Sequence, residues 1–163
     1  KKLQTVVFFF EIFKENLFRL TVRLFHIINQ KFLEIGSNNP KSKTAAILTG
    51  CKNIADAYKT GEYEVFVPDW GIHLQTKAPV GEHLCAVGLR AHYFNPKARE
   101  NSYPIEFTNE REDPFELRLL FRYQNQKEGI SDIWWRMPKD RRPDEMPECL
   151  GIASANVLLL YPE

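Results

Sequence analysis

Arginines and aromatic residues lie close together in three segments of the sequence that we predict as strands. An aromatic ring can stack on a flat ligand, and a guanidinium group can pair with its phosphate or carboxylate. Single-stranded nucleic acid binds to the same set of side chains, and an ordinary sheet uses it too, with arginine stems lying over aromatic core residues. The residues that we expect to line a ligand pocket are Phe66, Trp70, His83, Tyr93, Arg118, Tyr123, Trp135 and Arg136.

Four potential metal ligands occur within residues 73–92. Imidazole and thiolate groups are the usual ligands of zinc, but the spacing of these residues matches no familiar zinc motif. On a strand, the last histidine would face away from the second histidine and the cysteine. The sequence therefore leaves a metal site open and assigns no cofactor. The four residues are His73, His83, Cys85 and His92.

The sequence gives little support for an enzyme, because common catalytic motifs are missing. The sequence has no glycine-rich phosphate loop and no serine in a nucleophile elbow. A nucleophile–base pair of Cys85 with a histidine is conceivable from the residue types alone. We keep a small hydrolase-type enzyme that uses His or Cys as a third hypothesis.

Composition argues against a protein that binds duplex DNA. The chain of 163 residues has 22 basic and 21 acidic residues, a net charge of +1, whereas duplex DNA calls for a strongly basic face. Its three cysteines are too few for a disulfide framework, so a reducing environment is expected. We therefore expect a cytoplasmic protein, or the cytoplasmic part of a membrane-anchored one. The chain does not begin with Met, which suggests a piece of a longer protein.

The first 39 residues contain no proline, whereas the remaining residues hold all ten. Apolar residues recur at helical spacing over residues 6–35, which predicts one long amphipathic helix with a wide apolar stripe. Lys14, Glu15, Arg19 and Arg23 interrupt every window long enough to span a bilayer, so we do not expect a membrane span. The stripe instead predicts packing on the domain, or a homodimer or partner helix.

The rest of the chain predicts a second helix over residues 44–58 and then mostly antiparallel strands. The fold class expected is therefore α+β, with residues 1–36 as a packing or dimerisation helix and residues 37–163 as a sheet domain that forms one compact unit with it. One of the adjacent tryptophans Trp134 and Trp135 should enter the core, since neighbours on a strand face opposite ways. Strands are predicted over residues 62–70, 72–75, 83–94, 105–107, 117–123, 132–136 and 151–161.

Two stretches resemble GAF domains. Residues 54–69 read IADAYKTGEYEVFVPD, similar to a helix, a T-G-E turn and a strand that ends in V-P-D in that family. Residues 131–156 read SDIWWRMPKDRRPDEMPECLGIASAN and resemble its final hairpin. The resemblance implies a GAF/PAS-like sandwich with a sensory or dimerising role. It names no ligand, because the residue set of cyclic-nucleotide-binding members and the Cys-His pair for bilin attachment are missing.

The first functional hypothesis is a non-catalytic, small-molecule-sensing or regulatory domain. Its ligand, of a nucleotide-like class, would bind in a pocket on the sheet face, and the N-terminal helix would pass the signal to a partner. The alternative is an interaction or structural module that assembles through residues 6–35.

Overall fold

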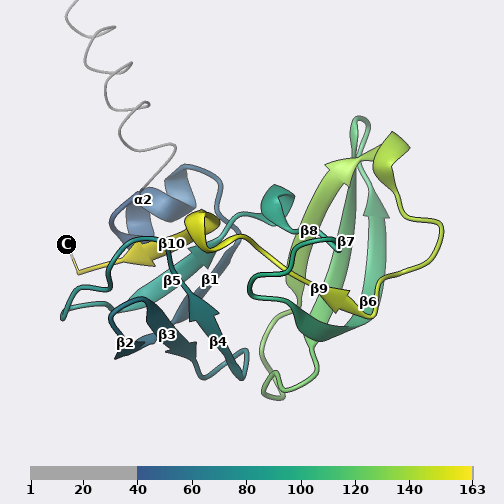
Figure 1. The fold of residues 1–163 in the computed structure, drawn as a ribbon. Coiled ribbons are helices and arrows are strands. Elements are labelled where there is room, and N and C mark those ends of the chain that lie inside the picture. Colours follow the sequence, from purple (N-terminus) through teal and green to yellow (C-terminus); the bar gives the residue numbers. More distant parts are fainter. Residues whose placement is uncertain (1–39, 163) are drawn as a thin grey trace, which may run out of the picture. The chain divides into compact units, whose positions relative to one another are not determined.

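The chain divides into two units, Lys1–Asn38 and Asn39–Glu163. The computed structural model describes residues 40–162, which belong to the second unit (Figure 1). The long helix expected over residues 6–35 and its role in assembly lie outside the described residues. In the described residues, no helix is long and apolar enough to cross a membrane.

The described residues form three antiparallel sheets of short strands. In the first, the strand order is β1-β5-β10, with β1 (Asn53–Asp56), β5 (Ala86–Leu89) and β10 (Val157–Leu160). In the second, the order is β2-β3-β4, with β2 (Tyr58–Gly61), β3 (Glu64–Val67) and β4 (Ile72–Gln75). In the third, the order is β8-β7-β6-β9, with β6 (Tyr103–Glu112), β7 (Glu116–Tyr123), β8 (Ile133–Pro138) and β9 (Cys149–Leu150).

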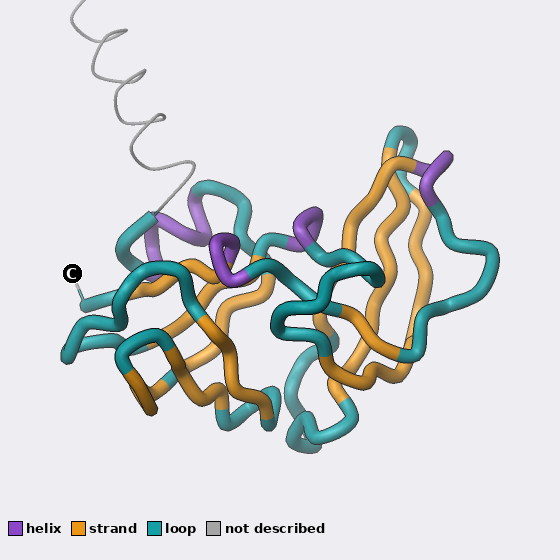
Figure 2. Tube along the Cα trace, viewed as in Figure 1, coloured by secondary structure: helices purple, strands orange, loops and turns teal. Residues whose placement is uncertain are grey.

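Helices contribute little to this part of the chain. Figure 2 shows short helical segments between long stretches of strand and loop. They are one α-helix, α2 (Lys43–Leu48), and the 3₁₀ turns η1 (Ala91–Tyr93), η2 (Lys139–Arg141) and η3 (Ser154–Asn156). The expected α+β fold class is therefore wrong: the described residues are mostly antiparallel sheet, and a GAF/PAS-like sandwich with long helices is not found.

The second helix ends at Leu48, well before the predicted end at residue 58. Ser42 caps its start by accepting a hydrogen bond from the backbone N–H of Ala45 at 3.3 Å. Two residues after Leu48 comes Gly50, whose φ of +85° is the left-handed conformation that commonly follows the end of a helix. Residues 53–56 then form strand β1, in which Asn53 and Ala55 are buried. The apolar residues in this stretch suit a strand as well as a helix, so their spacing alone does not distinguish the two.

Several predicted strands are confirmed. Residues 72–75 are β4, and the predicted segments 105–107 and 117–123 lie within β6 and β7. The segment 83–94 is divided instead, because the chain leaves β5 at the buried Arg90, whose guanidinium donates to the carbonyl of Thr49 at 2.7 Å. The expected closing hairpin is absent, since β8 pairs with β7 whereas β9 pairs with β6.

One hydrophobic core joins the three sheets. Side chains from β3, β4, β5, β7 and β8 belong to the same buried cluster. Phe121 on β7 lies at its aromatic centre, with Phe94 and Tyr123 in edge-on contact at ring-centroid distances of 5.3 and 5.4 Å. This packing fixes η1, which carries Tyr93 next to Phe94, against the third sheet.

Candidate functional site

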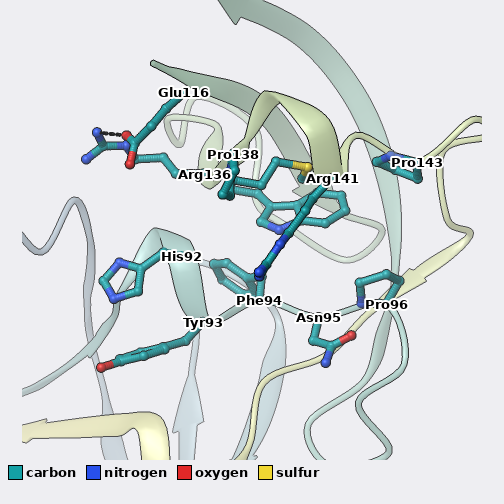
Figure 3. A pocket seen from close by; sticks show the side chains of 12 residues that line it. His92, Tyr93, Phe94, Asn95, Pro96, Glu116, Arg136, Pro138, Arg141 and Pro143 are labelled. Carbon is teal, nitrogen blue, oxygen red and sulfur yellow. Dashed lines mark hydrogen bonds and ion pairs between the residues drawn. The ribbon is translucent and has the colours of Figure 1, made fainter. Parts of the chain in front are cut away.

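A cleft of about 670 Å³ lies where η1 meets the edge of β8 (Figure 3). We call it the η1–β8 cleft. Its volume is that of a typical small-molecule site. It is lined by residues 92–96, Glu116, residues 135–138, Arg141 and Pro143.

Aromatic side chains form much of the wall of the cleft. Phe94 and Trp135 are almost fully buried and belong to the core, so they give this wall a fixed position. Tyr93 is 40% exposed, and its ring centroid lies 4.3 Å from that of His92. The cleft therefore combines a rigid apolar base with one accessible ring on which a flat molecule can stack.

Arg136 and Glu116 form an ion pair at one side of the cleft. Their strands are neighbours, and the register places Arg136 opposite Arg118, two residues beyond Glu116 on the same face of the sheet. One nitrogen of Arg136, Nε, is buried and has no hydrogen-bond partner. Because the carboxylate neutralises this guanidinium, Arg136 is not the strongest site for an added anion.

Arg141 supplies the available positive charge. It belongs to η2, directly after β8, and Figure 3 shows its side chain extending toward the middle of the cleft near Phe94. Among residues 40–162 it has no ion-pair or hydrogen-bond partner, whereas its neighbour Arg142 pairs with Glu110 at 3.0 Å. An anion could therefore bind Arg141 without first displacing a carboxylate.

The pKa of His92 is shifted by burial and by the charges of the cleft and its surroundings. Burial lowers this pKa below its ordinary value, and the positive charges of Arg90 and Arg136 lower it further. Glu116 acts in the opposite direction. These contributions together disfavour the protonated form of the imidazole.

The structure brings three of the eight expected pocket residues together in the cleft: Tyr93, Trp135 and Arg136. Trp70 instead lines a separate cleft of about 280 Å³ beside β1, and Tyr123 lies within the core. The other three occupy different surfaces. Phe66 packs on His73, His83 lies in an exposed loop, and Arg118 lies over the ring of Trp134.

The potential metal ligands are dispersed. His73 lies on β4 and pairs with Glu64, while His92 lies on η1. The thiol of Cys85 points at the carbonyl of Leu160, at 3.3 Å. In the part of the chain that the structure describes, no three His, Cys, Asp or Glu side chains are grouped so that they could hold a metal ion.

Sequence reasoning misses two charged residues of the cleft. Glu116 is the first residue of β7, and its charge, opposite to that of Arg136 on the next strand, is the available signal. Arg141 follows a strand within a segment rich in proline and charge, a composition that indicates only a connection. Its position depends on η2, which brings its side chain over the cleft.

Comparison with known proteins gives no family. No family model and no curated protein matches the sequence. The resemblance to GAF domains remains a prediction.

Proposed function

We propose that this domain binds a small, flat, anionic molecule in the η1–β8 cleft and acts as a non-catalytic binding module. The observation that carries the proposal is Arg141, a cation without a partner among the described residues, which extends over an aromatic wall. The accessible ring of Tyr93 offers a stacking surface, and the guanidinium of Arg141 offers donors for a phosphate or carboxylate. A nucleotide has both parts.

Thermal unfolding of the full chain tests the proposal. The probes are the four ribonucleoside 5′-monophosphates, with inorganic phosphate as the ring-free comparison. A ligand at about 100 times its dissociation constant should stabilise the protein by about 2.7 kcal/mol. We expect stabilisation by at least one nucleotide and less by phosphate.

Matched arginine variants locate the binding site. Arg141→Gln should abolish the stabilisation, whereas Arg142→Gln should retain it, because Arg142 lies outside the cleft and pairs with Glu110. Equal stabilisation of both variants would place the anion elsewhere. No stabilisation of the wild-type chain by any of these compounds would argue against the proposal.

The regulatory part of the hypothesis concerns residues outside the described range. Transmission of a signal through residues 6–35, and the alternative of assembly through the same segment, both remain predictions. Light scattering on chains with and without residues 1–36 tests the association: a dimer that becomes a monomer when these residues are removed would support it, and two monomers would contradict it.

A further inference from the structure

The two charged groups of the cleft that remain open to a ligand have opposite sign and come from different elements. Arg141 on η2 offers guanidinium donors. Glu116 at the start of β7 offers a carboxylate, of which Oε2 accepts from Arg136. Its Oε1 has no hydrogen-bond partner among residues 40–162.

A nucleotide that extends across the cleft contacts both groups. Its phosphate fits Arg141, since Glu116 would repel an anion and already neutralises Arg136. The part of the ligand that reaches Glu116 should instead present N–H donors, because an ionised carboxylate only accepts hydrogen bonds. A carboxylate oxygen without a partner in a partly enclosed site therefore favours a base that carries N–H donors over a base that lacks them.

Guanine is the common base that meets this requirement. Its Watson–Crick edge carries a ring N–H and an exocyclic amino group side by side, so two donors can face the two oxygens of one carboxylate. Adenine places an unprotonated ring nitrogen at the same position, and hypoxanthine lacks the exocyclic amino group. The ring system also suits stacking on Tyr93, though all purines share that property.

We propose that the η1–β8 cleft selects a guanine nucleotide, with guanine at Glu116 and the phosphate at Arg141. The proposal rests on the proposed function, in that it assumes that the cleft binds a flat anion. It adds the identity of the base and the direction in which the nucleotide lies.

Calorimetric titration of the full chain with GMP, IMP and AMP tests the choice of base. A hydrogen bond to a charged group contributes about 1.5–3 kcal/mol. GMP should therefore bind about ten- to hundredfold more tightly than IMP or AMP. Guanosine, which has the base without the phosphate, should bind more weakly than GMP.

Paired variants separate the two ends of the ligand. Glu116→Gln should bring the affinity ratio of GMP to AMP close to one, whereas Glu112→Gln should preserve it, since Glu112 pairs with Lys139 outside the cleft. The ratio of the two affinities is measured, and not the affinity for GMP alone, because removing the Glu116 charge also breaks the ion pair with Arg136 and so affects the binding of every anion. Arg141→Gln should reduce the affinity for GMP to that for guanosine.

The possible failures are distinguishable. Equal affinity of the wild-type chain for GMP, IMP and AMP, with all three weakened by Arg141→Gln, would overturn the guanine assignment and support the anion cleft. Binding of none of these compounds by the folded wild-type chain would overturn both. The comparison of nucleotides on the wild-type protein does not depend on whether a variant folds.

Discussion

The side chain of Asn53 binds the backbone of Trp134 in the way that a neighbouring strand would. The N–H of Trp134 donates to Oδ1 of Asn53 at 2.8 Å, and Nδ2 of Asn53 donates to the carbonyl of Trp134 at 2.9 Å. The same amide also donates to the carbonyl of Leu89 at 3.0 Å. One buried side chain thereby occupies part of the free edge of β8 and links it to β5.

Removing this amide should destabilise the domain strongly. Asn53→Ala removes a side-chain hydrogen bond from three backbone groups, of which only the Leu89 carbonyl is fully buried and the two groups of Trp134 are part-buried. A buried group left without a partner costs about 1–3 kcal/mol, and a part-buried one costs less because water can reach it. We expect a loss of about 2–4 kcal/mol in the free energy of unfolding, measured by urea denaturation. The neighbouring Lys52 is exposed, so Lys52→Ala should change stability by less than about 0.5 kcal/mol. Equal losses in the two variants would contradict the role given to Asn53.

Two glycines with similar backbone angles should respond differently to alanine. Gly71 has a φ of +66°, and a Cβ there would lie 2.3 Å from the carbonyl oxygen of Asn125. Gly129 has a φ of +78° with nothing within 4 Å of a Cβ. Gly129→Ala should cost about 1–2 kcal/mol from the left-handed backbone alone.

Gly71→Ala should carry a further penalty for the clash. Overpacking typically adds about 1–3 kcal/mol, and this one occurs against backbone, which cannot rotate away. Thermal or urea unfolding of both variants measures the difference. A Gly71→Ala protein as stable as Gly129→Ala would show that the loop at Asn125 moves to make room.

Alternation along strands is the part of the fold that the sequence predicts well. Leu117, Leu119 and Phe121 on β7 enter the core, while the residues between them, Arg118, Leu120 and Arg122, are only partly buried. The expectation for the paired tryptophans is also confirmed: Trp135 is buried, while Trp134 lies on the opposite face and is only partly covered. Patterns with a period of two predict strand positions well because the two faces of a strand lie in different environments.

The helix predicted over residues 44–58 fails for a physical reason. Short apolar runs satisfy helical and strand spacing equally, and Gly50 decides the outcome through a backbone conformation that composition does not reveal. The cleft is predicted in part, through Tyr93, Trp135 and Arg136. Arg141 reaches the cleft because η2 follows β8, an arrangement that depends on tertiary structure.

Arg118 and Trp134 should be energetically coupled. The guanidinium carbon lies 4.3 Å from the centre of the Trp134 ring, and Nη2 of Arg118 donates to Asp113 at 2.6 Å. A double-mutant cycle with Arg118→Gln and Trp134→Leu should give a coupling of about 0.5–1 kcal/mol. A second cycle with Arg118→Gln and Asp113→Asn shows how much of the Arg118 effect belongs to the ion pair. Additive effects of the first pair would exclude a favourable cation–π contact.

Protonation of His92 should destabilise the empty domain and strengthen the binding of an anion. Burial and the nearby positive charges of Arg90 and Arg136 lower its pKa in the folded protein, against the opposing charge of Glu116. The unfolded chain then binds the proton more readily, so this contribution to stability is present above about pH 6.5 and is lost as the pH falls below that value. Stability measured by urea denaturation should therefore decrease more between pH 7 and pH 5 in the wild-type protein than in His92→Gln.

The other titrating groups are common to both proteins, so the difference between them isolates His92. An anion bound at Arg141 should raise the pKa of His92, so binding should take up protons and become tighter at lower pH. Calorimetry with GMP in buffers of different ionisation enthalpy measures this uptake. The phosphate of GMP also titrates, with a second pKa of about 6, so the uptake that belongs to His92 is the difference between the wild-type protein and His92→Gln. Less proton uptake by the wild-type protein than by His92→Gln, or a stability difference that grows with rising pH above 7, would contradict the lowered pKa of His92.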